Sequence, residues 1–307
     1  MELLLQYSAK YIIVRNQICN IVNMEIIKSL KDISFEEIFI SFNEAFGSYE
    51  VQVNKEELLV MLKRRGFVKE LSFGAFENDR LISFTLNGIG QYNGVKTAYD
   101  TGTGTIDEFR GKGIATKIFN YSLPYLKAAG IKQYLLEVLQ HNSNAVSVYK
   151  KLGFETSREF NYFKQTNEFV KLNSKGLRDN FCFKEVDLRD KKQLFEFWDF
   201  SPSWQNSFEA IERSEDDFKT IGVYKDNQII GYSIFEPNSG DLTQIAVNKE
   251  FRRHGIGSAL LCETLKVNKF NSVKAVNTEI NCESITAFLQ SNNIPLCGKQ
   301  FEMIKVL

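Results

Sequence analysis

The chain has 307 residues, of which 43% are hydrophobic, so it is long enough for two domains that each bury a core. Its 38 lysines and arginines balance 38 aspartates and glutamates, which argues against a broad surface for nucleic acid or an anionic membrane. The five cysteines form no C-x-x-C pair and only two histidines are present. We therefore expect no disulfide framework and no metal site, and a reducing, cytoplasmic compartment.

Residues 1–23 lack the basic start, the apolar centre and the small-residue cleavage site of a signal peptide. The residues from Met24 onward have the pattern of a first β-strand, so we expect an N-terminal extension over 1–23 and a folded domain after it. No apolar run approaches the roughly 20 residues that cross a bilayer as a helix, and we expect no membrane partner.

The first half of the chain shows strand and helix patterns in a clear order. After the strand at 24–30 come two amphipathic helices, at 34–47 and 54–67, with Ser34 and Asn54 as their caps. Turn dipeptides then separate three strands, at 72–77, 80–90 and 95–106. The remaining elements are a helix that ends at Gly130, a buried strand at 134–140, a helix at 144–153 and a last strand.

The second half repeats this order after a polar connection near 166–180. Its expected elements are a strand at 183–188, helical segments at 190–200 and 206–214, strands at 218–226, 227–236 and 241–248, a helix after residue 255, a strand at 273–280, a helix at 283–292 and a strand from 300. Arg110 and Arg252 are 142 positions apart, and so are Glu137 and Glu279. This constant offset indicates an internal duplication.

Each half carries nearly the same sequence motif between a strand and a helix. Residues 108–119 read EFRGKGIATKIF, and residues 250–261 read EFRRHGIGSALL. A glycine turn at this place leaves backbone N–H groups free for a phosphate, and the helix N-terminus adds a favourable dipole. We predict a diphosphate site in each copy, made by Arg110, Gly111, Lys112, Gly113, Ile114, Ala115 and Thr116, and by Arg252, Arg253, His254, Gly255, Ile256, Gly257 and Ser258. A single such turn is often only a tight connection, but two matched copies favour a ligand.

Two other phosphate-binding motifs fit less well. A Walker loop needs Ser or Thr after its lysine, but Gly113 follows Lys112. A dinucleotide fingerprint needs a third glycine where the first copy has Thr116, although Glu137 lies at about the distance of its ribose-binding acid. An oxidoreductase that binds NAD is therefore the less favoured alternative.

The first copy of this motif, at 110–115, resembles the acetyl-CoA signature of the GNAT N-acetyltransferase superfamily, written Q/R-x-x-G-x-G/A. The segment NSNAVSVYKKLGF at 142–154 resembles the family's next motif, and 252–257 matches the signature in the second half. The resemblance covers nearly all of the chain after residue 23. It implies the α/β (α+β) class, with two tandem GNAT-like domains at 24–170 and 178–307, each a mixed, mostly antiparallel, splayed sheet flanked by helices.

The resemblance also implies a binding mode for acetyl-CoA. In the family the cofactor lies between two splayed strands, and its pantetheine arm pairs with the edge of the signature strand. The residues at that edge here are Thr103, Thr105 and Ile106 in the first half and Ile245 and Val247 in the second. A backbone N–H at this edge would stabilise the developing oxyanion.

Two residues of the second motif have roles in the family. A tyrosine at the position of Tyr149 usually gives a proton to the leaving thiolate, and the position of Asn142 lies near the pantetheine. Without the resemblance, Tyr149 would be an ordinary aromatic at the edge of the core and Asn142 a helix cap. Aligning Asn281 with Asn142 places Phe288 at the position of Tyr149, and phenylalanine cannot donate a proton. We therefore expect catalysis in the first half.

The general base is open among four carboxylates near the expected cleft: Asp100, Asp107, Glu108 and Glu137. We prefer Asp100, because it lies in a polar strand and could also bind a cationic acceptor.

Acceptor specificity in the family usually comes from the region between the first two helices. This region contains Phe46 and Tyr49 in the first half, and Trp198 and the segment 204–206 in the second. Aromatic residues in such a loop also commonly pack on their own domain. The sequence thus predicts an acetyl-CoA-dependent N-acetyltransferase that acts directly on an amine of a small molecule or peptide. A non-catalytic acyl-CoA-binding or sensing protein is the alternative from another class.

Overall fold

The computed structural model describes residues 25–47, 52–172 and 181–307. The expected extension over 1–23, Tyr49 and the boundary at 178 lie outside these residues. The described chain divides into two compact units. The first unit contains 25–47, 52–53, 68–86 and 102–126, and the second contains 54–67, 87–101, 127–172 and 181–307.

The first unit is built on antiparallel strands and two helices. Its elements are β1 (Ile26–Ser29), α2 (Phe35–Phe46), β2 (Phe73–Glu77), the first part of β3 (Arg80–Tyr92), the last part of β4 (Val95–Thr105), most of α4 (Ile114–Ala128) and the 3₁₀ turns Lys69–Leu71 and Asp107–Phe109. β2 pairs with β1 and with the start of β3. A buried cluster with Phe73, Ile82, Ile114 and Ile118 joins β2 and β3 to the start of α4.

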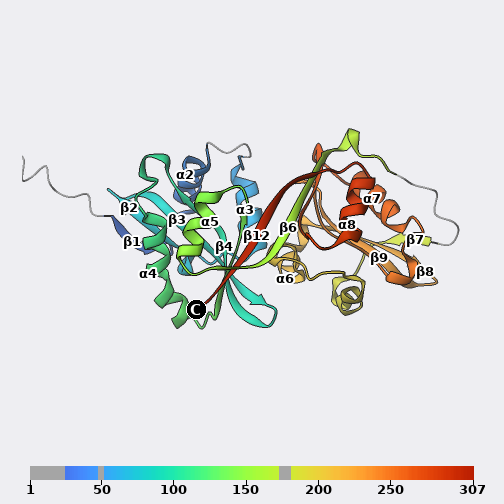
Figure 1. Ribbon diagram of the computed structural model, residues 1–307, viewed down its shortest axis with the longest axis horizontal. Helices are drawn as coiled ribbons and strands as arrows, with labels where there is room; N and C mark the ends of the chain where they lie inside the picture. Colours follow the sequence, from blue (N-terminus) through green and yellow to red (C-terminus); the bar gives the residue numbers. More distant parts are fainter. Residues whose placement is uncertain (1–24, 48–51, 173–180) are drawn as a thin grey trace, which may run out of the picture. The chain divides into compact units, whose positions relative to one another are not determined.

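The second unit contains the other elements of both repeats, many of which are labelled in Figure 1. From the first half come α3 (Lys55–Arg65), the rest of β3 and β4, β5 (Gln133–Leu139), α5 (Ser143–Lys151) and β6 (Glu155–Thr166). From the second half come β7 (Phe181–Lys184), α6 (Phe208–Arg213), β8 (Lys219–Lys225), β9 (Gln228–Glu236), β10 (Asp241–Val247), α7 (Ile256–Lys266), β11 (Ser272–Glu279), α8 (Glu283–Ser291) and β12 (Leu296–Val306). The 3₁₀ segments are Asn167–Phe169, Leu188–Phe197, Trp204–Asn206, Glu215–Asp217 and Lys249–Phe251.

The sheet of the second unit contains an exchange of strands between the halves. Its order is β3-β4-β5-β12-β6-β11-β10-β9-β8-β7, with β3 and β4 contributing only their parts in this unit. The last strand of the chain, β12, thus lies between β5 and β6, while β6 pairs with β11 of the second half. Figure 1 shows β12 and β6 side by side. β6 and β12 pair antiparallel through Phe160 with Gln300 and Asn161 with Lys299. The repeat order in the sequence did not predict this exchange.

Local sequence signals correctly predicted where several elements begin and turn. Ser34 and Asn54 each accept a hydrogen bond from the third helical N–H, and the glutamate there bonds back to the cap N–H. The predicted hairpin turns are also confirmed, because Asn78 and Asp79, and likewise Asn93 and Gly94, have positive φ angles.

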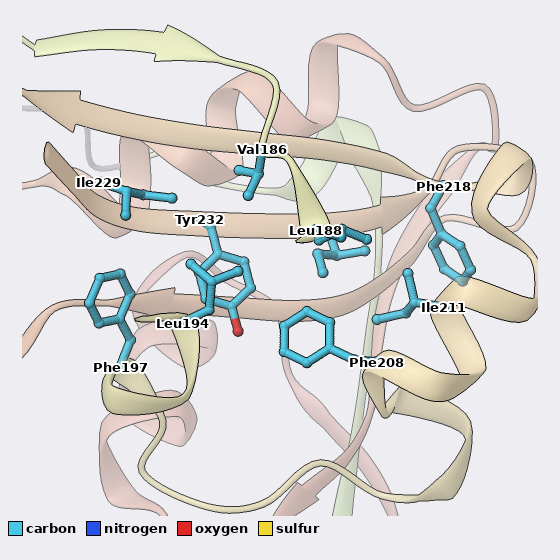
Figure 2. Packing of buried hydrophobic residues seen from close by; sticks show 10 residues of the cluster. Val186, Leu188, Leu194, Phe197, Phe208, Ile211, Phe218, Ile229 and Tyr232 are labelled. Carbon is cyan, nitrogen blue, oxygen red and sulfur yellow. The ribbon is translucent and has the colours of Figure 1, made fainter. Parts of the chain in front are cut away.

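One predicted helix is of a different type. The segment expected to be helical at 190–200 is a 3₁₀ helix over Leu188–Phe197 and is not helical from 198 to 200. A 3₁₀ helix has three residues per turn, so Leu188, Leu194 and Phe197 lie on one side, and all three are buried. Figure 2 shows them in the apolar cluster that joins this segment to β9 and α6. The three-residue spacing of large apolar residues favours this geometry over the α-helix.

Candidate active site and cofactor pocket

The two copies of the motif between strand and helix have the same backbone conformation at their turns. Gly111 and Gly113 have φ angles of 76° and 73°, and Arg253 and Gly255 have φ angles of 66° and 84°. This left-handed region favours glycine, so Arg253 shows that the second copy keeps the turn at some cost in strain. The helices then begin at Ile114 and at Ile256.

Both turns suit an anion at a helix N-terminus. A Cβ added to Gly111 or Gly113 would meet no heavy atom within 4 Å beyond its chain neighbours. The N–H of Lys117 donates to the Gly113 carbonyl (3.1 Å), and the N–H of Ala259 donates to the Gly255 carbonyl (3.0 Å). The amides before these first helical bonds have no partner within the helix and can donate to a phosphate.

The signature arginines hold the turns in place. Arg110 donates to the carbonyls of Thr105 (3.1 Å) and Ala45 (2.6 Å), and Arg252 donates to those of Val247 (3.0 Å) and Phe197 (3.0 Å). Each guanidinium therefore ties its turn to the preceding strand and to the segment that ends the first helical region.

Asp199 adds a charged partner in the second copy. It accepts hydrogen bonds from Arg252 (2.9 Å) and Ser284 (2.7 Å). Burial alone would raise the pKa of Asp199, but these two hydrogen bonds and the charges of Arg252 and Lys249 together hold the pKa below the ordinary value. Asp199 therefore keeps its charge beside Arg252.

The second half holds a cavity of about 1270 Å³ at its signature turn. This volume is large enough for an extended ligand, because sites for small molecules are commonly about 300–1,000 Å³. All nine residues predicted to bind cofactor in this half border the cavity: Ile245, Val247, Arg252, Arg253, His254, Gly255, Ile256, Gly257 and Ser258. Their role in binding stays a prediction.

The cavity lies where two parallel strands separate. β10 and β11 pair at Asp241 and Lys274, near the start of both strands. Farther along, Ile245 of β10 and Thr278 of β11 both border the cavity. Splayed strands of this kind expose backbone groups that can pair with a ligand.

The two residues predicted to act in catalysis are in contact with each other. The Tyr149 hydroxyl, on α5, donates to Oδ2 of Asp100, on β4 (3.2 Å). β4 pairs with β5 from Thr97 to Tyr99, so Asp100 directly follows the last paired residue. The Tyr149–Asp100 pair therefore lies where these two strands begin to separate.

A second polar pair lies on the other face of the same strands. Tyr99 precedes Asp100 and so points to the opposite face. Its hydroxyl donates to Oε2 of Glu137, on β5 (2.9 Å). Burial raises the pKa of Glu137, and the charge of Glu302 adds to this, whereas Asn277, Arg65 and Tyr99 act in the opposite direction.

A model of the acetyltransferase (GNAT) family matches residues 35–154 and 185–288, which together are more than half of the chain. The chain belongs to the GNAT acetyltransferase family. The predicted resemblance and the predicted fold class, with two GNAT domains in tandem, are confirmed.

A curated GNAT relative is N-alpha-acetyltransferase 30 of Schizosaccharomyces pombe (strain 972), which is 36% identical over 86 residues. The match covers 28% of this chain and 57% of that protein. Among solved structures, a GCN5-related N-acetyltransferase from Sphaerobacter thermophilus has a TM-score of 0.68 and 12% identity over 92% of this chain and 95% of that one. A tandem GNAT protein from the clavulanic acid biosynthesis pathway has a TM-score of 0.68 and 10% identity over 92% and 98%. At such identities the structures show the fold alone.

The GNAT repeat identifies the counterpart of Asp100 in the second half. Tyr99 pairs with Leu135 in the first half, and Asp241 pairs with Lys274 in the second. Tyr99 and Asp241 are 142 positions apart, the offset of the two signatures. The residue that corresponds to Asp100 is therefore Leu242.

The counterpart of Tyr149 is Leu289, and the predicted alignment with Phe288 is wrong by one residue. The N–H of Phe154 donates to the Tyr149 carbonyl, and the N–H of Ile294 donates to the Leu289 carbonyl, at an offset of 140 positions. Leu242 and Leu289 belong to one buried apolar cluster. An apolar pair thus replaces the polar pair of the first half.

The helix caps correct the same alignment. Asn142 is the cap of α5 and Cys282 is the cap of α8, so the predicted match of Asn281 with Asn142 is also wrong by one residue. Phe288 borders the cavity, and a Cβ on Gly257 would lie 3.1 Å from its ring. Glycine at 257 therefore makes room for the Phe288 ring.

Strand pairing shows that the two glutamates do not correspond to each other. Leu139 pairs with Gln300 and Glu279 pairs with Phe160, so Glu279 corresponds to Leu139 and not to Glu137. β11 has a register shift between Ala275 and Thr278, where Asn277 has a φ angle of 61°. The bulge adds one residue to β11. Glu279 lies 140 positions after Leu139, so the 142 positions between Glu137 and Glu279 are not the spacing of corresponding residues in these strands. The duplication itself stands.

The remaining predicted cofactor residues have structural partners in their own units. Thr103 donates to Thr85 (3.3 Å), Thr105 shares a hydrogen bond with Ser83 (2.7 Å), and the N–H of Ile106 donates to the Ile82 carbonyl (3.1 Å). Asn142 accepts from the N–H of Ala145 (3.2 Å) and so caps α5. Their predicted roles in binding stay predictions.

The aromatic residues of the predicted acceptor regions mostly pack inside the protein. Phe46 lies against Phe42, with ring centroids 4.6 Å apart. Trp204 is 1% exposed and stacks on Tyr99, which favours the packing interpretation. Trp198 borders the cavity, and its indole N–H donates to the Tyr232 hydroxyl (2.6 Å).

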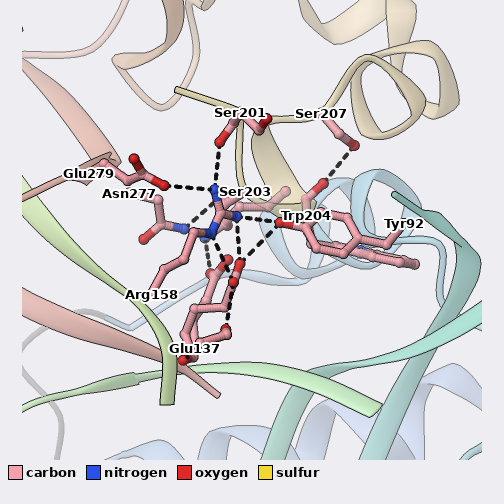
Figure 3. A network of polar contacts seen from close by, with 12 residues as sticks. Tyr92, Glu137, Arg158, Ser201, Ser203, Trp204, Ser207, Asn277 and Glu279 are labelled. Carbon is pink, nitrogen blue, oxygen red and sulfur yellow. Dashed lines mark hydrogen bonds and ion pairs between the residues drawn. The ribbon is translucent and has the colours of Figure 1, made fainter. Parts of the chain in front are cut away.

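A polar network that no sequence pattern predicted is centred on Arg158 of β6 (Figure 3). Arg158 donates to both oxygens of Glu302 on β12 (2.9 and 2.7 Å), to Glu279 on β11 (3.3 Å) and to the Ser201 carbonyl (2.6 Å). No local signal could have shown these contacts, because they depend on the exchange of β6 and β12.

The described part of the chain holds neither a cluster for a metal ion nor a helix suited to span a membrane. Within 25–47, 52–172 and 181–307, no group of three or more His, Cys, Asp or Glu side chains could hold a metal ion. No helix in the described part of the chain is both long enough and apolar enough to cross a bilayer.

Proposed function

We propose that the chain is an acetyl-CoA-dependent N-acetyltransferase that transfers an acetyl group directly to an amine of a small molecule or peptide. The observation that carries this proposal is the Tyr149–Asp100 hydrogen bond where β4 and β5 separate. The second half has Leu242 and Leu289 instead. A polar pair kept in one copy and lost in the other fits one catalytic copy and one copy without this chemistry.

Acetyl-CoA supplies the activated thioester. The backbone N–H groups at the starts of α4 and α7 suit its diphosphate, because open space surrounds Gly111 and Gly113 and a cavity borders Gly255. We assign Arg110 and Arg252 to holding these turns, since both donate to backbone carbonyls.

Tyr149 serves as the general acid. Its phenol gives a proton to the thiolate as the bond from carbon to sulfur breaks and the bond from carbon to nitrogen forms. Asp100 accepts a hydrogen bond from the Tyr149 hydroxyl and so orients it. This role differs from the expected one, in which Asp100 was the preferred base.

Glu137 fits the role of the base best among the other three carboxylates. Asp107 and Glu108 form ion pairs on the surface, with Arg110 (2.7 Å) and Arg80 (2.8 Å). Glu137 lies where β4 and β5 separate, and burial raises its pKa, which makes its carboxylate a stronger base. It removes the amine proton directly or through one water.

The second half favours a different function. Because its counterpart pair is apolar and its cavity is large, we infer that it binds a CoA-type ligand without the acid chemistry of the first half. The sensing alternative thus applies to this half alone.

A thiol-release assay with acetyl-CoA and a panel of polyamines, amino acids, aminoglycosides and peptides tests the proposal. We expect release with one class of amine, and a fall in kcat of about 100-fold in Tyr149→Phe with little change in KM for acetyl-CoA. Tyr121→Phe, an exposed tyrosine of α4, is the matched control. An unchanged kcat in Tyr149→Phe removes this acid from the mechanism, and no release with any amine refutes the activity.

A further inference from the structure

A segment of the second half packs against residues of the first half within the second unit. The Trp204 ring stacks on Tyr99, with centroids 5.2 Å apart and an interplanar angle of 6°. Its indole N–H donates to the Arg65 carbonyl (3.0 Å). A Cβ on Gly90 would lie 3.1 Å from the Trp204 ring, so glycine at 90 gives the ring its space. The Trp204 segment therefore has a defined place beside β4 and β5.

Gln205 follows Trp204 and is held by three hydrogen bonds. Its amide nitrogen donates to Oε2 of Glu137 (2.6 Å), and its amide oxygen accepts from Arg65 (2.9 Å). Its backbone carbonyl accepts from Arg64 (2.8 Å). Arg158 holds the start of the same segment through the Ser201 carbonyl (Figure 3). Every donor and acceptor that fixes Gln205 belongs to the first half of the sequence.

We propose that Gln205, a residue of the second half, is a positioning residue for acetyl transfer in the first half, because it holds the Glu137 carboxylate for the acceptor amine. This inference rests on the proposed function, which assigns Glu137 to the amine. Oε2 of Glu137 accepts from both Tyr99 and Gln205. Two hydrogen bonds to Oε2 restrict the rotation of the carboxylate, and a base held in one orientation removes a proton faster than one that rotates.

The groups around Glu137 explain what Gln205 does to its charge. Tyr99 of β4, Arg65 of α3 and Asn277 of β11 favour the ionised form, while burial and Glu302 of β12 disfavour it. A hydrogen bond donated by Gln205 also favours the ionised form. Without it, Glu137 keeps its proton to a higher pH and is a base over a narrower range.

Gln205→Met tests this directly, since it keeps the length of the side chain and removes the donor. We expect the titration of the Glu137 carboxyl, followed by ¹³C NMR and assigned with Glu137→Gln, to move upward by about one pH unit. The acid limb of kcat/KM for the amine moves by the same amount. Gln205→Glu keeps an acceptor for Arg65, removes the donor and moves both further in the same direction; it also covers the case in which the methionine variant does not fold.

Gln165→Met is the matched control, because the Gln165 amide donates to the Asn293 carbonyl (2.8 Å) away from Glu137. An unmoved Glu137 titration in Gln205→Met overturns the proposal, and so does an equal shift in Gln165→Met. The NMR titration needs no turnover. A wild-type protein that transfers no acetyl group therefore refutes the proposed function separately, while the titration still decides whether Gln205 controls Glu137.

Discussion

Glu137 combines a buried position with several opposing electrostatic effects. Burial raises its pKa, and Asn277, Arg65 and Tyr99 offset only part of this rise. A carboxyl group with a raised pKa in the folded state binds its proton more tightly there than in the unfolded chain. The free energy of unfolding therefore decreases as the pH rises through the folded pKa, and the cost is absent below the unfolded pKa.

Glu137→Gln removes this charge and keeps an oxygen that can accept from Tyr99 and Gln205. We expect it to raise the melting temperature relative to wild type at about pH 8, and to change it much less at about pH 3.5, where the Glu137 carboxyl of wild type is protonated in both the folded and the unfolded chain. Thermal unfolding at the two pH values measures this. Glu168→Gln, at an exposed glutamate, serves as the control. A Glu137→Gln variant that is less stable than wild type at the higher pH contradicts the prediction.

Single residues were predictable where their role is local. The capping residues Ser34 and Asn54, and the turn at Asn93 and Gly94, act through their own neighbours in the chain, so their type is sufficient evidence. The residue of the second half that corresponds to Tyr149 was predicted one position too early. The bulge at Asn277 adds a residue to β11 that no sequence pattern indicates. The pairing of Tyr149 with Asp100 was not predicted as a contact, although both residues were named.

At the scale of elements, the exchange of β6 and β12 joins the two repeats into one sheet. Either strand has the alternation needed to pair within its own half, so the sequence alone could not choose between the two arrangements. The choice depends on contacts between residues about 140 positions apart, such as Arg158 with Glu302. Burial strengthens this pair, because the Glu302 side chain is 3% exposed and that of Arg158 is 18% exposed.

Breaking this pair should be costly, while replacing both partners should not be. Arg158→Met leaves the Glu302 charge buried and lowers the free energy of unfolding by about 3–5 kcal/mol. Arg158→Met with Glu302→Leu recovers most of that loss. Arg80→Met, which breaks exposed pairs with Glu44 and Glu108, costs below about 1 kcal/mol. Urea unfolding of the four proteins measures the differences, and a small effect of Arg158→Met shows that the exchange does not depend on this pair.

For the whole molecule, the order of elements was readable in both halves because apolar periodicity and turn residues are local. The repeated signature also revealed the duplication and the family. What differs between the copies lies in their interiors, where Leu242 and Leu289 replace Asp100 and Tyr149. Both halves keep the signature turn, but only the first half keeps the polar pair. We infer that the duplicated molecule binds two CoA-type ligands and transfers an acetyl group at one of them.

Calorimetric titration with acetyl-CoA tests whether the molecule binds two ligands. Gly113→Asp adds a side chain and a negative charge beside the helix N-terminus that would hold the diphosphate, and Gly255→Asp does the same at the second turn. We expect two equivalents bound by wild type, one by each variant and none by the double variant.

Gly94→Asp is the matched control, because Gly94 has a φ angle of 76° and no heavy atom within 4 Å of an added Cβ, but lies in a hairpin turn. All three single variants share a strain of roughly 1 kcal/mol, so only the stoichiometry separates them. At about 100 times Kd each bound ligand adds about 2.7 kcal/mol to the free energy of unfolding, and the rise in melting temperature should decrease with each lost site. A single equivalent in wild type that Gly113→Asp leaves intact would place the cofactor in the second half alone.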